Sequence, residues 1–237
     1  MKFDIEYYSN IGKRSENQDS LLFDISNGEL IACIADGVGG KLGGRQASNF
    51  SVNVFIENYK SQNSNPLKLP EIVLNIHKGI ILEAQKEKYF GMATTFTGII
   101  LNGSKLYGIH TGDTRACILR GNGIKQLTHD HTEVARLVKE GRISFEESIT
   151  YPRRNIIESA LGIEDVEPLL QNYNFNIIKG DRIILTTDGV HETISKRDFR
   201  DISLKSNSSK QFLDTLIEYL LRKEPNDNNS IIVITII

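Results

Sequence analysis

The sequence has few cysteines and no long apolar run. Its two cysteines, Cys33 and Cys117, both lie in apolar, strand-like stretches, so we expect buried thiols in a reduced protein rather than a secreted disulfide. The longest run of apolar residues and threonine, 231–237, has seven residues, whereas a membrane-spanning helix needs about 20. The first four residues contain no apolar signal-peptide core. The sequence therefore predicts a cytoplasmic protein with no membrane segment.

A strong excess of charge of either sign is also missing. The 28 Lys and Arg against 30 Asp and Glu give a net charge of −2, which leaves no global cationic field to hold nucleic acid or anionic lipid. Nucleic acid and membrane are therefore not expected as partners. A content of 39% hydrophobic and 24% charged residues is typical of a globular domain. The 237 residues allow one catalytic domain, 1–237, with a substantial core.

Short β-type runs separated by Gly and Asp dominate the chain. The expected strands are 3–8, 20–25, 30–35, 95–101, 105–109, 115–119, 182–186 and 230–237. The expected helices are 47–59, 70–86, 132–139 and 210–221, with apolar residues on one face. Strands in runs and helices in pairs predict an α+β fold, a β-sandwich of two antiparallel sheets with helices on its outer faces. The polar segment 141–168 has weak periodicity, and we expect it to be mobile over a site.

Aspartates stand where predicted strands end or the chain turns. Asp36-Gly37 and Asp188-Gly189 each follow an apolar strand, and a strand end followed by Gly can present a carboxylate and a carbonyl to one ion. A single Asp-Gly is most often a plain turn. Two of them with no His or Cys cluster nearby favour an all-oxygen site for Mg²⁺ or Mn²⁺ over zinc.

The ordered motifs of the whole chain resemble one family. They are Arg14-x-x-Asn17-Gln18-Asp19, Ala35-Asp36-Gly37-Val38-Gly39-Gly40, Ala93-Thr94-Thr95, Gly112-Asp113-Thr114-Arg115, Tyr151-Pro152-Arg153-Arg154-Asn155, Ala160-Leu161-Gly162, Gly180-Asp181, Thr187-Asp188-Gly189 and Asp227-Asn228. The set resembles the metal-dependent protein phosphatases of the 2C type, in their bacterial serine/threonine branch. That resemblance implies a central β-sandwich flanked by pairs of helices, which agrees with the pattern of strands and helices.

The resemblance also implies roles for site residues. It makes Asp36 the carboxylate that bridges two Mn²⁺ or Mg²⁺ ions and Gly37 a ligand through its carbonyl oxygen. Asp188 and Asp227 complete the two metal sites. Two such ions lower the pKa of a bridging water, and the resulting hydroxide attacks phosphorus directly, without a phosphoenzyme.

Further residues carry roles around these two ions. By resemblance, Asp19 is a more distant partner that orients metal-bound water, and Arg14 grips the substrate phosphate with its planar fork. Asp113 matches a residue that helps hold a third, weaker ion together with Asp188. A structural alternative stays open, in which Asp113 caps its turn and pairs with Arg115.

Two departures from the family concern the flap and the proton donor. The flap corresponds to 140–155, where Tyr151 stands in place of a histidine found in many bacterial relatives. Some members have a histidine directly after the Asp-Gly pair, but this chain has Val38. A protein acid for the leaving group therefore cannot be residue 38.

The histidines have plainer explanations than catalysis. His129 and His131 are two positions apart with no further Cys or His partner, so we expect polar loop residues rather than a zinc pair. His110 is expected to be a hydrogen-bonded residue at a strand end.

The sequence thus predicts a cytoplasmic hydrolase, a serine/threonine phosphoprotein phosphatase of bacterial signalling. Its partners would be phosphoserine and phosphothreonine proteins made by a cognate kinase, and it would be a monomer. Two alternatives stay open: a metal-dependent hydrolase of a small phosphorylated metabolite, because the flap and not the metal site selects the leaving group, and a non-catalytic pseudophosphatase. The second would require loss of a ligand, whereas all the matched aspartates are present.

Overall fold

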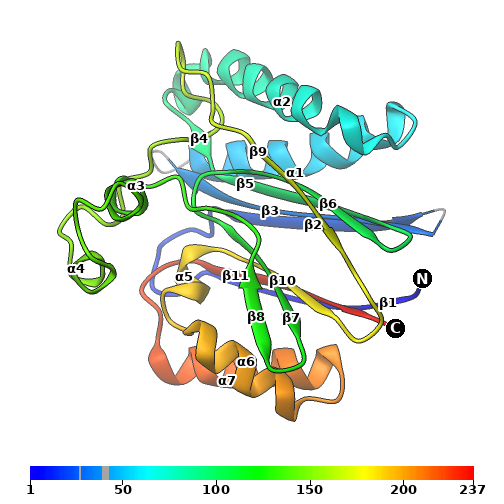
Figure 1. The fold of residues 1–237 in the computed structure, drawn as a ribbon. Coiled ribbons are helices and arrows are strands. Elements are labelled where there is room, and N and C mark those ends of the chain that lie inside the picture. The colour runs from blue at the N-terminus through cyan, green and yellow to red at the C-terminus, as the bar shows by residue number, and fades with distance from the viewer. Residues whose placement is uncertain (27, 39–42) are drawn as a thin grey trace.

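The protein, seen in a computed structural model, is built from two antiparallel sheets stacked face to face, with helices on both outer faces (Figure 1). The structure describes residues 1–26, 28–38 and 43–237. Gly39 and Gly40 of the second motif lie outside the described residues. One sheet has the order β1 (Phe3–Asn10), β11 (Asn229–Ile236), β10 (Arg182–Thr186), β7 (Arg115–Arg120) and β8 (Gly123–Gln126). The other has β2 (Asp19–Ser26), β3 (Glu29–Val38), β5 (Phe96–Asn102), β6 (Lys105–Thr111) and β9 (Gln171–Asn176), with β4 (Ala93–Thr94) paired to β3.

Helices cover each sheet from outside, as predicted. Helices α1 (Gly43–Ser61) and α2 (Leu69–Ala84) pack over the β3 sheet, and α6 (Lys196–Lys205) and α7 (Ser209–Lys223) pack over the β11 sheet (Figure 1). Short 3₁₀ turns, Pro66–Lys68 and Glu87–Tyr89, flank α2. Among the described residues, no helix combines the length and the apolarity that a bilayer crossing requires.

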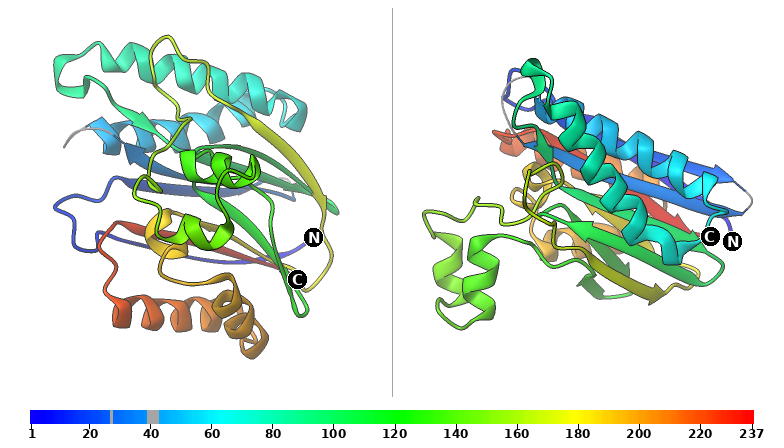
Figure 2. Two further views of the ribbon diagram at one scale, coloured as in Figure 1. Left: turned by 60° about the vertical axis from the view of Figure 1, so that its left-hand side comes forward. Right: turned by 90° about the horizontal axis from the view of Figure 1, so that it is seen from above.

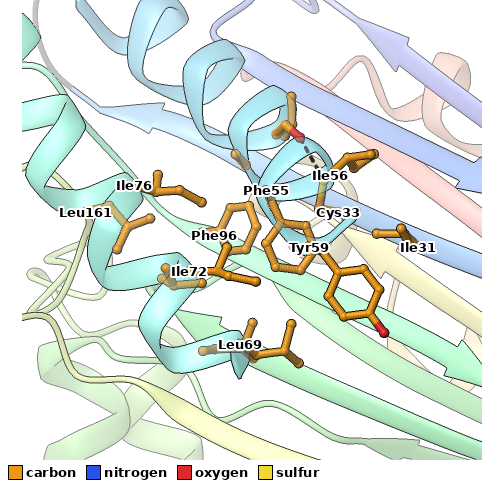
Figure 3. Packing of buried hydrophobic residues seen from close by; sticks show 14 of the residues in the cluster. Ile31, Cys33, Phe55, Ile56, Tyr59, Leu69, Ile72, Ile76, Phe96 and Leu161 are labelled. Carbon is orange, nitrogen blue, oxygen red and sulfur yellow. Dashed lines mark hydrogen bonds between the residues drawn. The ribbon is translucent and has the colours of Figure 1, made fainter. Parts of the chain in front are cut away.

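The central strands are apolar along both faces because both faces are buried. In β3, Ile31, Cys33 and Ala35 face the helices, while Leu30, Ala32 and Ile34 face the other sheet. The helix-side cluster packs Phe55 edge-on against Phe96, with ring centroids 5.0 Å apart (Figure 3). Strand β11 alternates in the same way, with Ile232 and Ile234 between the sheets and Val233 against α7. The β-sandwich core thus holds the ends of β3 and β11 in fixed positions.

The predicted mobile segment, 141–168, contains one short helix, and a second precedes it. Helices α3 (Glu133–Lys139) and α4 (Phe145–Ile149) form a lobe that projects from the side of the sandwich (Figure 2). Ser144 caps α4 in a reciprocal capping box with Glu147. This lobe includes the predicted flap, 140–155.

Candidate functional site

A cleft of about 1170 Å³ opens at one edge of the sandwich, and most of the predicted site residues line it. It is lined by 14–20, the end of β3, residues of α1, Asn155 and Ile157 beyond α4, and Asp188 with 227–228. Each sheet contributes strand ends here. Asp36 in β3 lies opposite Asp19 at the start of β2. Asp188 begins the short helix α5 (Asp188–His191) after β10, and Asp227 precedes β11.

The backbone of Asp36 is fixed from the neighbouring strand. The Thr95 amide donates to the Asp36 carbonyl at 2.9 Å, and the Asp36 amide donates to the Thr95 hydroxyl at 3.0 Å. The Thr94 hydroxyl donates to the same carbonyl at 2.8 Å. The Ala-Thr-Thr motif therefore fixes the backbone that carries the Asp36 carboxylate.

Gly37 lies where no side chain fits. A Cβ at this position would lie 2.1 Å from the carbonyl oxygen of Gly44, at the start of α1. The Gly37 amide donates to the carbonyl of Gln18 at 3.1 Å. Glycine at 37 thus lets the end of β3 approach α1 while lining the cleft.

The carboxylates are buried together, and burial combined with mutual repulsion opposes their ionisation. Burial raises the pKa of Asp19 to about 7 and that of Asp188 to about 6, and it raises the pKa of Asp36 well above its ordinary value. The neighbouring aspartates raise all three pKa values further. Thr187 donates to one oxygen of Asp19 at 2.9 Å, and this hydrogen bond lowers its pKa in part.

This donor set fits a hard divalent cation. One oxygen each of Asp19, Asp113 and Asp188 is buried without a hydrogen-bond partner. Clustered carboxylate oxygens that repel one another are the ligands that Mg²⁺ and Mn²⁺ prefer. In the described part of the chain, no three Asp, Glu, His or Cys side chains are arranged to enclose an ion by themselves. Asp227 is instead paired with Arg14.

Arg14 lies in the cleft, but its partner is a predicted metal ligand. Its Nε donates to Asp227 Oδ1 at 2.8 Å and its Nη2 to Oδ2 at 2.5 Å, a bidentate pair. The Arg14 side chain is 60% exposed, so the pair lies at the mouth of the cleft. The fork geometry that holds this carboxylate also suits two oxygens of a phosphate.

Asp113 lies apart from the main cleft, in a smaller pocket of about 250 Å³ that it shares with Asp188. Burial first, and the charge of Asp188 second, raise the pKa of Asp113 to about 8. The alternative pairing of Asp113 with Arg115 is wrong. Arg115 donates through two nitrogens to Asp130, which follows β8, with Nε 3.0 Å from Oδ1.

The flap is tied to its base by Tyr151. The Tyr151 hydroxyl donates to Glu133 Oε1 at 2.9 Å, and Arg153 Nε donates to Glu133 Oε2 at the same distance. Arg154 and Asn155 line the smaller pocket beside Asp188. Val38 lines the main cleft with a side chain that donates no proton.

Among the side chains of the main cleft that sequence reasoning missed are two polar ones on α1. Arg45 and Asn49, on the first turns of α1, both line it. Arg45 lies 3.6 Å from Glu16. Helical periodicity would have placed them on the polar face of α1, but nothing in the sequence shows that this face borders the cleft.

The family profile described as Protein phosphatase 2C matches residues 8–230. The chain belongs to the protein phosphatase 2C family. It is 31% identical over 227 residues to the serine/threonine protein phosphatase PstP of Mycobacterium tuberculosis, covering 94% of this chain but only 43% of that relative's length. The family and the fold predicted from the sequence are confirmed.

Solved structures agree with the protein phosphatase 2C assignment. The serine/threonine phosphatase of S. agalactiae superposes with a TM-score of 0.90 at 26% identity, covering all of both chains. The catalytic domain of PstP in complex with two manganese ions superposes with a TM-score of 0.82 at 29% identity, covering 99% of each chain.

Proposed function

We propose that this chain is a metal-dependent serine/threonine phosphoprotein phosphatase that hydrolyses phosphate monoesters. The proposal rests on the cleft that is lined by the buried Asp19 and the half-buried Asp36 and Asp188, with Arg14 at its mouth. A polyvalent cation would stabilise the ionised form of these clustered carboxylates, and Arg14 supplies a fork for a phosphate. The names of the relatives support the same activity.

Asp36, Gly37, Asp188 and Asp227 would hold two Mn²⁺ or Mg²⁺ ions, as two manganese ions are held in the PstP structure. When bound, such a pair supplies an acidified water and positive charge against the phosphate. Asp188 Oδ1, which is buried without a hydrogen-bond partner, would become a metal ligand. Asp19, hydrogen-bonded to Thr187, would orient a water at the edge of this group.

Arg14 would take the substrate phosphate, for which it must release Asp227. Both partners gain from the exchange, because Asp227 becomes a metal ligand and the guanidinium meets two phosphate oxygens. The bidentate fork would orient the phosphoester in the cleft. Asp113, with its unpaired buried oxygen, would join Asp188 in holding a third and weaker ion in the smaller pocket.

The substrates would be phosphoserine and phosphothreonine proteins made by a cognate kinase. A cleft of about 1170 Å³ is large enough for a phosphorylated side chain with part of its peptide. We further infer a monomer in the cytoplasm, where the free buried thiols Cys33 and Cys117 would stay reduced.

The test is phosphate release from a phosphothreonine peptide with Mn²⁺, with Mg²⁺ and with excess chelator. Activity should require the ion, and Asp36→Asn should lower turnover by several orders of magnitude because it removes a charged ligand. The matched control is Asp214→Asn, the same chemical change on the exposed face of α7. Full turnover in chelator, or wild-type turnover of Asp36→Asn, would contradict the proposal.

A further inference from the structure

The turn 112–114, which presents Asp113, is bonded on one side to a histidine. The Gly112 amide donates to His131 Nδ1 at 3.2 Å, and the His131 amide donates back to the Gly112 carbonyl at 2.7 Å. Because Nδ1 accepts a hydrogen bond, the ring is neutral and carries its proton on Nε2. Burial lowers the pKa of His131, which agrees with a neutral ring at neutral pH.

Gly112 needs such an anchor. Its φ is +97°, and a Cβ would lie 2.5 Å from the Cβ of Thr95, so the position admits only glycine. Glycine has the greatest conformational freedom of any residue, and the hydrogen bonds to His131 restrict the backbone of Gly112. Thr95 is the residue that fixes Asp36, so the turn borders the backbone support of the main site.

The other side of the turn is held by a buried hydrogen-bond chain. Thr114 and Thr97 hydroxyls lie 2.7 Å apart, Thr97 lies 2.8 Å from His110 Nδ1, and His110 Nε2 donates to the His129 carbonyl at 3.0 Å. Burial lowers the pKa of His110 to about 3, so this ring is neutral as well. The prediction that His110 is a satisfied strand-end residue is therefore confirmed.

The backbone of His131 also anchors the end of the flap. The Glu158 amide donates to the His131 carbonyl at 2.8 Å, and the Glu133 amide donates to the Ile156 carbonyl at 2.9 Å. His131 thus bonds both to the Asp113 turn and to the chain that returns from the flap.

We propose that His131 is a positioning residue, which fixes the Asp113 turn through Gly112 and sets that turn at a constant distance from the flap. The proposal rests on the proposed function in one respect, since it takes Asp113 as a ligand of the third ion. The side chain and the backbone of His131 have separate roles: Nδ1 orients the turn, and the carbonyl oxygen holds the flap.

A purely structural role is the competing explanation. The rings of His110 and His131 pack with centroids 4.9 Å apart, so removal of the ring also removes packing. A structural role predicts lower stability alone. A positioning role predicts, in addition, faster hydrogen exchange of the Gly112 amide and weaker binding of the most weakly held Mn²⁺ ion.

The experiment compares His131→Ala, His131→Asn and the control His129→Ala. Asparagine places a side-chain oxygen near the position of Nδ1, and the side chain of His129 is exposed. Hydrogen exchange of the Gly112 amide is measured by NMR in metal-free protein, and Mn²⁺ binding is measured by calorimetry.

In His131→Ala the Gly112 amide should exchange roughly tenfold faster or more, and the weakest Mn²⁺ step should weaken by about the same factor. His131→Asn should restore most of the Gly112 protection and most of the Mn²⁺ affinity. The control His129→Ala should change neither quantity. Unchanged Gly112 exchange in His131→Ala, or unchanged Mn²⁺ binding despite faster exchange, would overturn the proposal. If His131→Ala does not fold, His131→Asn decides alone, and faster Gly112 exchange in that variant would count against the proposal.

These readouts separate the proposal from the proposed function. A wild-type protein that releases no phosphate would contradict the phosphatase activity. Gly112 exchange and Mn²⁺ binding would still show whether His131 positions the turn.

Discussion

Arg14 and Asp227 form a bidentate pair at the mouth of the cleft, although 213 positions separate them in the sequence. The motifs marked both residues as functional, but neither motif indicates that the two side chains contact each other. The contact follows from the sandwich, which brings the chain before β2 beside the chain before β11. A guanidinium next to a cluster of buried carboxylates is attracted to the most exposed of them.

Replacement of Arg14 should separate phosphate binding from metal binding. Arg14→Ala should raise the KM for a phosphothreonine peptide about tenfold or more, because a bidentate charge-assisted contact is lost. Mn²⁺ binding should stay the same or tighten, because Asp227 loses a competing partner. Steady-state kinetics and calorimetry measure the two effects.

Arg14→Lys is the graded control for this prediction. An ammonium keeps the charge but cannot bond to two oxygens at once. Arg14→Lys should therefore reverse only part of the increase in KM that Arg14→Ala causes. Equal kinetic constants for Arg14→Ala and the wild type would remove Arg14 from the site.

At the scale of elements, apolar runs were the most informative signal. Strands β3 and β11 were predictable because burial on both faces makes them continuously apolar. Strand β9 was missed because its sequence, Gln171–Asn176, alternates polar with aromatic residues and pairs on one side only, with β6. Helix α6 was missed because Phe199 is its one buried residue. Elements with few buried apolar residues, such as β9 and α6, thus leave a weaker signal in the sequence.

The site shows the same division between local and long-range information. Asp19 and Asp36 share a hairpin, so their proximity follows from local pairing in register. Arg115 bonds to Asp130, which follows β8, whereas the alternative drawn from adjacency in sequence paired it with Asp113. The residue types were enough to predict the chemistry of the site, whereas which side chains bond to each other depends on the fold.

The flap is held to its base by the contact of Glu133 with Tyr151 and Arg153. Glu133→Ala removes the hydrogen bonds from both Tyr151 and Arg153, while Tyr151→Phe removes only the one from Tyr151 and keeps the ring. We expect proteolytic cleavage within 141–155 to become faster in the order wild type, Tyr151→Phe, Glu133→Ala. Because the lobe lies outside the sandwich core, the melting temperature should change little.

Limited proteolysis with the melting curve as control checks this ranking. Glu133 is half-buried and lies outside the sandwich core. A large drop in the melting temperature of Glu133→Ala would therefore mean that the flap unfolds together with the core. Equal cleavage rates in all three proteins would mean that these bonds do not restrain the flap.

At the scale of the whole molecule, the two sheets place acidic strand ends against one another. β2 and β3 contribute Asp19 and Asp36, and the β10–β11 sheet contributes Asp188 and Asp227. Thr187 of one sheet donates to Asp19 of the other, so the site also joins the layers. Folding therefore concentrates negative charge at the edge of the sandwich, and the stability of the whole should depend on how that charge is neutralised.

The sign of this dependence follows from the raised pKa values. In the folded protein the pKa is about 6 for Asp188, about 7 for Asp19 and about 8 for Asp113, each against 3.8 for the unfolded chain. The folded state therefore binds more protons than the unfolded state between these limits. The contribution of these groups to stability is fully present below about pH 4 and is lost as the pH rises through 6 to 8.

In excess chelator, the melting temperature should accordingly fall as the pH rises from 6 to 9. Saturating Mn²⁺ should raise the melting temperature most at the high end of this range, because the ion replaces the protons that the carboxylates have lost and binds only the folded site. Asp113→Asn should flatten the pH dependence in chelator by removing the group with the highest of the three pKa values, whereas Asp214→Asn on α7 should leave it unchanged. Differential scanning calorimetry at several pH values measures all four cases. A melting temperature in chelator that stays level or rises between pH 6 and 9 would mean that the carboxylates are not buried together in the metal-free protein.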